Sequence, residues 1–165
     1  MTFEVRKMLK FSDYHTKIFE DLEKKSTQVP DTLVALGAGL SRTGTLSLKA
    51  ALTELLHGRC AHGIDTLAGD QEDIDVVVKA TAGEMEPEDW RNYFLGKKYV
   101  AAVDIPFNIN YKEIMKAFPN VKIILTTRDP KTWYQSIKRL FDFHGLQEQT
   151  WAFRLITKGG SITHT

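Results

Sequence analysis

The segment from Val34 to Leu52 constrains the fold of this chain more than any other stretch of its sequence. A short apolar run ends in a loop of small residues, and this loop leads directly into a helix-like pattern. Glycine lets the backbone approach a phosphate closely, and the N–H groups and dipole at a helix N-terminus favour an anion. The segment therefore predicts a strand, an anion-binding loop and a helix in succession.

Strand-like and helix-like segments alternate along the rest of the chain. The expected strands are Thr32–Leu36, Tyr99–Asp104 and Val121–Thr127. The expected helices are Phe11–Lys25, Thr45–His57, Asp73–Ala82, Asn110–Phe118, Pro130–Phe143 and Leu146–Ile156, with another opening at Pro87–Trp90. The helix after the anion loop has an apolar stripe, made by Leu48, Leu52, Leu55 and Leu56, and a stop signal, Gly58. Because the strands are continuous apolar runs, we expect an α/β fold: a P-loop-type three-layer sandwich with a central parallel sheet and helices on both faces.

Composition and charge narrow the class of protein. The chain has 165 residues, of which 42% are hydrophobic and 26% charged, as in an ordinary globular domain. A formal net charge of +1 gives no broad electrostatic case for a nucleic acid or membrane partner. Charges interrupt the stretch from Met1 to Lys25, which argues against a signal peptide or membrane span there. Cys60 is the sole cysteine, so no intrachain disulfide can form, and we expect a cytoplasmic protein.

Ligands of parallel α/β sheets bind at the carboxyl ends of the strands. Three loops follow expected strands, namely Gly37–Thr45, Asp104–Pro106 and Arg128–Pro130. We therefore expect all three loops to lie along one edge of the sheet, where they could form a common site.

The first of these loops resembles a P-loop only in part. Gly39 and Gly44 have the G-x-x-x-x-G spacing, but Thr45 and Leu46 replace the Lys-Ser/Thr pair, and the cation lies earlier, at Arg42. A small P-loop kinase or NTPase is disfavoured, because it needs that pair for the phosphate and Mg²⁺. A dinucleotide fingerprint is disfavoured too, because Arg42 replaces its third glycine. The alternative to an anion site is a tight strand–helix turn made by the glycines.

A second phosphate could be clamped at the same edge. Arg128 directly follows an expected strand, and Ser136 lies eight residues later in the next helix. A guanidinium and a hydroxyl both suit a tetrahedral anion. The alternatives are an ion pair of Arg128 with Asp129 or Asp104, and a solvated Ser136.

Asp104 closes an apolar strand, so we expect a partly buried carboxylate suited to general-base work. The alternative is a helix cap or a structural partner of Arg42 or Arg128. His62 and Cys60 are a weak pair of potential metal ligands, but two ligands do not make a metal site. We interpret both as structural and expect no bound metal.

Three motifs, taken together and in order, resemble those of the sulfotransferases. They are SRTGTLSLKAAL, AVDIPF and VKIILTTRDPKTWYQS, and the resemblance runs from about Leu33 to Ile137. More narrowly, the chain is similar to the sulfotransferase-like branch often labelled NAD-dependent epimerase. This resemblance implies 3′-phosphoadenosine-5′-phosphosulfate (PAPS) as the sulfuryl donor and no metal.

The resemblance also implies roles for individual residues. The loop would bind the 5′-phosphosulfate, with Arg42 where many members carry a lysine. Arg128 and Ser136 would bind the 3′-phosphate, and Asp104 falls where cytosolic members carry a catalytic histidine base. The implied catalytic residues are thus Asp104 and Arg42. The implied PAPS-binding residues are Arg42, Thr43, Gly44, Thr45, Arg128 and Ser136.

We expect a single sulfotransferase-like domain over 1–165, with a helical extension (1–31), an α/β core (32–157) and a disordered tail (158–165). The family usually continues further, so we expect a chain truncated at its C-terminus. The implied function is sulfuryl transfer from PAPS to a hydroxyl or amine of a small-molecule acceptor, or an inactive relative of such an enzyme. The alternatives are a small P-loop kinase or NTPase and a non-catalytic interaction domain. The sequence indicates neither the acceptor nor the oligomeric state.

Overall fold

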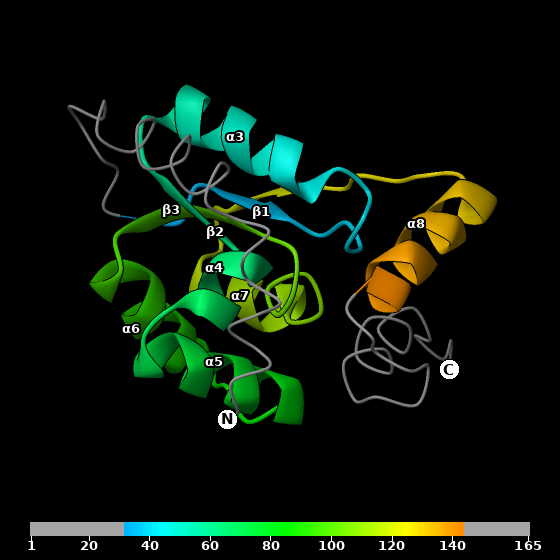
Figure 1. The fold of residues 1–165 in the computed structure, drawn as a ribbon. Helices are drawn as coiled ribbons and strands as arrows, with labels where there is room; N and C mark the ends of the chain where they lie inside the picture. The colour runs from blue at the N-terminus through cyan, green and yellow to red at the C-terminus, as the bar shows by residue number, and fades with distance from the viewer. Residues whose placement is uncertain (1–31, 144–165) are drawn as a thin grey trace, which may run out of the picture.

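A computed structural model describes residues 32–143 of the chain (Figure 1). Its centre is a four-stranded parallel sheet with the strand order β2-β3-β1-β4. The strands are β1 (Ala35–Gly37), β2 (Arg59–His62), β3 (Tyr99–Val103) and β4 (Lys122–Ile124). The helices are α3 (Thr45–Leu56), α4 (Gly63–Ala68), α5 (Gln71–Ala82), α6 (Pro87–Gly96), α7 (Tyr111–Ala117) and α8 (Pro130–Phe143).

Helices cover both faces of this sheet. Figure 1 shows α3 on one face and α4, α5, α6 and α7 on the other, which makes three layers. Helix α8 lies to the side, next to the loop that follows β1. The predicted α/β class, with a parallel sheet and interleaved helices, is therefore confirmed.

The larger part of the core lies under α5, α6 and α7. Trp90, Phe94 and Phe107 are fully buried there, with ring centroids of Phe94 and Phe107 5.5 Å apart. A smaller cluster under α3 contains Leu52, Cys60 and Val103. Since each aromatic ring removes a large apolar area from water, the first cluster supplies most of the hydrophobic stabilisation.

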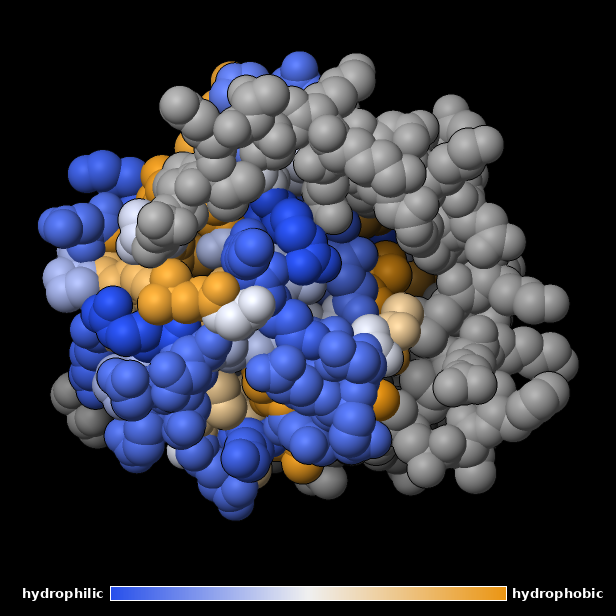
Figure 2. Space-filling model, turned by 90° about the vertical axis from the view of Figure 1, so that its left-hand side faces the viewer, coloured by the Kyte–Doolittle hydropathy of each residue, from blue (hydrophilic) through white to orange (hydrophobic). Residues whose placement is uncertain are grey.

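Polar side chains define where α5 begins and how it packs. The Asp73 N–H donates to Asp70 Oδ1, and the Asp70 N–H donates to Asp73 Oδ2, both at 3.1 Å, which is a reciprocal cap. The Tyr93 hydroxyl of α6 donates to Asp73 Oδ1 at 2.9 Å. The described residues visible in Figure 2 are mostly hydrophilic, with small groups of hydrophobic residues between the polar ones.

The expected strands differ from the observed ones in position and exposure. Strand β1 begins later than the predicted Thr32–Leu36, and β4 is shorter than Val121–Thr127. Strand β4 lies at the edge of the sheet, and two apolar residues of the expected strand are exposed there, Ile123 to 38% and Leu125 to 69%.

Strand β2 and helix α4 were not predicted. The strand reads RCAH, which is too short and too polar to stand out as an apolar run. Its burial comes from the neighbouring β3, whose five residues are all buried.

Helix α3 was predicted correctly except for its stripe and its end. Leu55 is 74% exposed, whereas Lys49 and Thr53 of the same helix are buried. The left-handed residue after the helix is His57 (φ 49°), not Gly58. Gly58 is needed for a close approach instead, because a Cβ there would lie 2.7 Å from Cγ2 of Val100.

The helices predicted over Phe11–Lys25 and Leu146–Ile156, and the tail 158–165, lie outside the described residues. Between residues 32 and 143, no helix is both long and apolar enough to cross a membrane.

Candidate functional site

The carboxyl ends of the strands place the candidate residues at one edge of the sheet. Gly37 pairs in register with Val103 of β3 and Ile124 of β4, and His62 pairs with Val103. Because all pairs are parallel, the segments that follow these strand ends emerge on the same side. The predicted meeting of the three loops at one edge is confirmed.

The loop after β1 folds back on itself before α3 begins. The Thr43 N–H and hydroxyl both donate to the Leu40 carbonyl, at 3.2 and 2.6 Å. Arg42 and Gly44 have left-handed backbones, with φ of 71° and 98°. A Cβ on Gly44 would meet no atom within 4 Å, so this glycine is required by its φ and borders open space.

Gly39 is required for a different reason, which is a close approach to the segment after β4. A Cβ at this position would lie 2.1 Å from Oγ1 and 2.7 Å from the carbonyl oxygen of Thr126. The Thr126 hydroxyl also lies 2.8 Å from that of Thr43. The loop is therefore packed against the segment that follows β4, and this segment continues to Arg128.

The N-terminus of α3 has the electrostatics of an anion site. The first helical bond runs from the Leu48 N–H to the Gly44 carbonyl, so the preceding N–H groups of the helix have no acceptor within it. The first turn contains no acidic residue, and no side chain caps it. Its partial positive charge therefore remains available to an anion.

Three predicted site residues that are far apart in the sequence meet at this loop: Arg42, Arg128 and Ser136. Arg42 Nε donates to Ser136 Oγ at 3.1 Å, and Arg128 Nη1 donates to the Arg42 carbonyl at 3.1 Å. Neither of the alternative partners considered for Arg128, Asp129 and Asp104, is seen bonded to it among residues 32–143. Two guanidinium groups and a hydroxyl thus gather beside α3.

A tryptophan of α8 fixes this helix to the loop. Trp133 Nε1 donates to the Ser41 carbonyl at 2.8 Å. Since Ser136 lies on the same helix, this bond also sets the distance between the Ser136 hydroxyl and Arg42.

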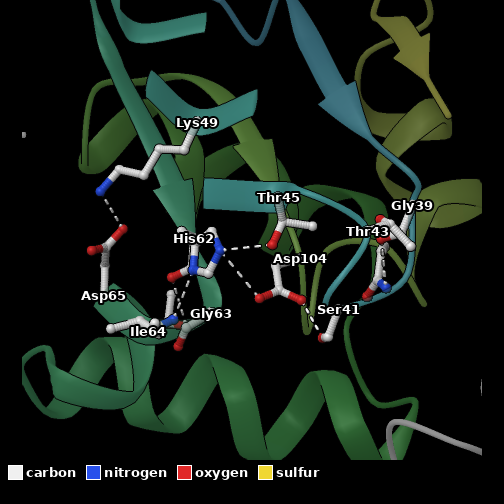
Figure 3. Close-up of polar contacts among 12 residues, drawn as sticks. Gly39, Ser41, Thr43, Thr45, Lys49, His62, Gly63, Ile64, Asp65 and Asp104 are labelled. Carbon is white, nitrogen blue, oxygen red and sulfur yellow. Dashed lines mark hydrogen bonds and ion pairs between the residues drawn. The ribbon is translucent and has the colours of Figure 1, made fainter. Parts of the chain in front are cut away.

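Behind the loop lies a buried polar cluster, which we define as Ser41, Thr45, His62 and Asp104 (Figure 3). The Ser41 hydroxyl donates to Asp104 Oδ1. The other carboxylate oxygen, Oδ2, lies 3.2 Å from His62 Nε2, which in turn lies 3.0 Å from Thr45 Oγ1. Asp104 is 9% exposed, in agreement with the partial burial predicted for it.

As an alternative to a general base, we considered Asp104 as a structural partner of Arg42 or Arg128. Its carboxylate contacts Ser41 and His62 instead. Asp104 has a left-handed backbone (φ 70°), which aspartate tolerates better than most residues. Both of its partners were missed in the sequence. Ser41 opens the SRTG motif and gave a usable signal, whereas His62 ends a strand that was not predicted.

The protonation state of His62 follows from its surroundings. The Ile64 N–H donates to Nδ1 at 3.1 Å, so this nitrogen is the acceptor and Nε2 carries the proton. Burial lowers the pKa of His62, although the nearby carboxylates of Asp104 and Asp65 oppose this effect. The ring is therefore neutral near pH 7 and donates from Nε2.

His62 and Cys60 lie in different surroundings, which fits their structural interpretation. Cys60 packs with Leu52 and Val103, whereas His62 is bonded within the polar cluster. Within the described part of the chain, no group of three or more His, Cys, Asp or Glu is placed to bind a metal.

Comparison with known proteins assigns the class to which this fold and site belong. The family described as the sulfotransferase domain matches residues 35–164, which is most of the chain. The chain therefore belongs to the sulfotransferase domain family.

The chain is also similar to a curated fungal protein. Ava biosynthesis cluster protein M of Aspergillus versicolor is 31% identical over 106 residues. The match covers 61% of this chain and 40% of that protein, so the chain spans less than half the length of this relative.

Proposed function

We propose that this chain binds PAPS at the loop after β1 and transfers its sulfuryl group to a hydroxyl or amine of a small-molecule acceptor. The observation that carries the proposal is the meeting of Arg42, Arg128 and Ser136 beside the N-terminus of α3. Two cationic side chains next to a helix N-terminus suit a ligand with several anionic groups. Family membership makes PAPS the donor to test.

The groups present fit a nucleotide with phosphates on two positions of its ribose. The N–H groups of α3 and the Thr45 hydroxyl suit the 5′-phosphosulfate, whereas the Thr43 N–H and hydroxyl already donate to the Leu40 carbonyl. Arg128 and Ser136 suit the 3′-phosphate. Arg42 bonds Ser136 through one of its five N–H groups, so the rest of its guanidinium can serve the neighbouring anion.

In the proposed reaction the acceptor oxygen or nitrogen attacks the sulfuryl sulfur as the bond from sulfur to the bridging phosphate oxygen breaks. The acceptor proton passes to Asp104, and the products are the sulfated acceptor and 3′,5′-ADP. The Arg42 guanidinium and the loop N–H groups stabilise the charge that develops on the bridging oxygen. Because arginine does not give up its proton readily, Arg42 acts as a fixed charge and not as an acid.

Asp104 retains the capacity for this role although both of its oxygens are engaged. Each carboxylate oxygen has two acceptor positions; the Ser41 hydroxyl occupies one on Oδ1, and His62 Nε2 lies 3.2 Å from Oδ2. The Asp104 side chain is 12% exposed, so it is not sealed from the edge where the loops meet.

Retention on immobilised 3′,5′-ADP tests the proposal. The wild-type chain should be retained and released by free 3′,5′-ADP, and Arg128→Ala should lose retention, because a charge-assisted contact to the 3′-phosphate is removed. Lys79→Ala is the matched control, since it removes one exposed cation from α5 on the far side of the sheet. Equal retention of Arg128→Ala and Lys79→Ala would refute the assignment of the 3′-phosphate to Arg128.

A further inference from the structure

His62 connects the anion loop to the proposed base, although nothing in the sequence motifs marks it. Its Nε2 lies 3.0 Å from Thr45 Oγ1 and 3.2 Å from Asp104 Oδ2 (Figure 3). The ring is only 2% exposed, so it cannot itself contact an acceptor molecule. It can act only through these two neighbours.

We propose that His62 is a positioning residue: its Nε2–H donates to Thr45 Oγ1 and orients that hydroxyl toward the 5′-phosphosulfate, and its ring lies against the carboxylate of Asp104, 3.2 Å from Oδ2. This proposal rests on the proposed function, because it assigns a role in binding the same nucleotide. It adds a residue from β2, the strand that the motifs do not include.

The direction of the hydrogen bonds supports this role. The Ile64 N–H occupies Nδ1 at 3.1 Å, which leaves Nε2 as the N–H donor of the ring. A hydroxyl has one proton and two acceptor positions. When Thr45 Oγ1 accepts from His62, its own proton is directed away from the ring and remains free to be donated.

The position of Thr45 determines what that proton can reach. Thr45 is the first residue of α3 and follows Gly44, whose Cβ position borders open space. The unpaired N–H groups of the first turn lie on the same helix end. A hydroxyl proton directed to this end adds a donor to those N–H groups and strengthens binding of the anion placed there.

The cluster also links both ends of the loop. Ser41, near the start of the loop, donates to Asp104 Oδ1, while Thr45, at its end, is joined to Asp104 Oδ2 through His62. His62 therefore completes a chain of side chains that sets the spacing between the anion loop and the carboxylate.

A ratio of two affinities tests the proposal and separates positioning from a general structural role. The probes are 3′,5′-ADP and adenosine 3′-phosphate, which lacks the 5′-phosphate, and both are titrated calorimetrically. Their affinity ratio reports the 5′-phosphate contribution alone. His62→Leu should lower this ratio about tenfold, the effect of one hydrogen bond to a charged group. His62→Gln, which keeps a side-chain N–H donor, should restore most of the ratio.

A double variant tests whether His62 acts through the Thr45 hydroxyl. If His62 acts through the Thr45 hydroxyl, His62→Leu should lower the ratio no further when combined with Thr45→Val. His57→Asn is the control, since His57 is exposed beyond α3 and asparagine tolerates its left-handed backbone. This control should keep the wild-type ratio.

The outcomes are distinct. A wild-type chain that binds neither probe refutes both the proposed function and this inference. A wild-type chain that binds 3′,5′-ADP, with the same ratio in His62→Leu, refutes this inference alone. Should His62→Leu fail to fold, nitrogen-15 NMR of the wild-type histidines, assigned with His62→Gln, decides: we expect the Nε2–H tautomer, and an Nδ1–H tautomer would overturn the proposal.

Discussion

His62 shows most clearly how position changes the chemistry of a single residue. An exposed histidine is half-protonated near pH 6.5. Here burial lowers the pKa of His62, and the charged groups that face it are Asp104 at the end of β3, Asp65 on α4, Lys49 on α3 and Arg42 in the loop. The carboxylates favour the charged ring and the cations oppose it, but burial has the largest effect, so the folded state keeps the ring neutral.

This lowered pKa predicts a pH-dependent stability. Below about pH 6.5 the unfolded chain binds a proton at His62 that the folded chain does not. The free energy of unfolding should therefore fall as the pH drops from about 6.5 toward the lowered pKa, by at most about 1.4 kcal/mol per pH unit from this residue. Urea unfolding at pH 7.5, 6.5 and 5.5 measures this change in the free energy of unfolding.

His62→Gln provides the comparison, because glutamine does not titrate. Its stability should fall less steeply with decreasing pH than that of the wild type. Parallel pH profiles for wild type and His62→Gln would contradict the neutral, buried state of the ring.

Gly39 carries the second prediction at this scale. Gly39→Ala would place a methyl group 2.1 Å from Thr126 Oγ1, so the loop must move, and we expect a loss of about 1–3 kcal/mol in the free energy of unfolding. Gly96→Ala is the control, since a Cβ there meets no atom within 4 Å and alanine favours the helix α6. Denaturant unfolding compares them, and equal stability of the two variants would contradict the close packing of the loop.

At the scale of elements, the attachment of α8 to the loop is the contact on which the site depends. Trp133 Nε1 donates to the Ser41 carbonyl, and on the same helix Ser136 accepts from Arg42. Strand β4, which leads to this helix, lies at the edge of the sheet. The helix is therefore placed by a few polar contacts together with the burial of Ile137 and Phe141.

Trp133→Phe should weaken binding of 3′,5′-ADP about fivefold, because it removes one hydrogen bond while keeping an aromatic ring. Tyr134→Phe is the control, since Tyr134 is the next residue on α8 and is 49% exposed. Calorimetric titration measures both variants. Wild-type affinity in Trp133→Phe would show that this bond does not position the helix for the nucleotide.

The elements also show what local sequence could predict and what it could not. Helix α3 was predicted from its apolar stripe, α8 from the proline that opens it, and β3 from its continuous apolar run. Strand β2 could not be predicted from its own residues, because the segment RCAH becomes a strand only through pairing with β3. The exposure of Leu125 was missed for a related reason, since burial of an apolar residue depends on what packs over it.

At the scale of the whole molecule, the meeting of the loops at one edge was predictable, but the contacts within it were not. The parallel sheet requires that the segments after β1, β3 and β4 emerge together. The bond from Arg42 to Ser136 spans 94 positions, and it depends on how α8 sits against the loop. The contact of His62 with Asp104 depends likewise on two strands that no local pattern connects.

The central claim is that the edge of this sheet binds a nucleotide with phosphates at both the 3′ and 5′ positions. Calorimetric titration of the full chain with three nucleotides tests this claim most directly. The ligands are 3′,5′-ADP, ATP with Mg²⁺, and NAD. We predict binding of 3′,5′-ADP that is at least tenfold tighter than that of the other two, because only it offers a 3′-phosphate to Arg128 and Ser136. Preferential, Mg²⁺-dependent binding of ATP, or binding of none of the three, would contradict the claim.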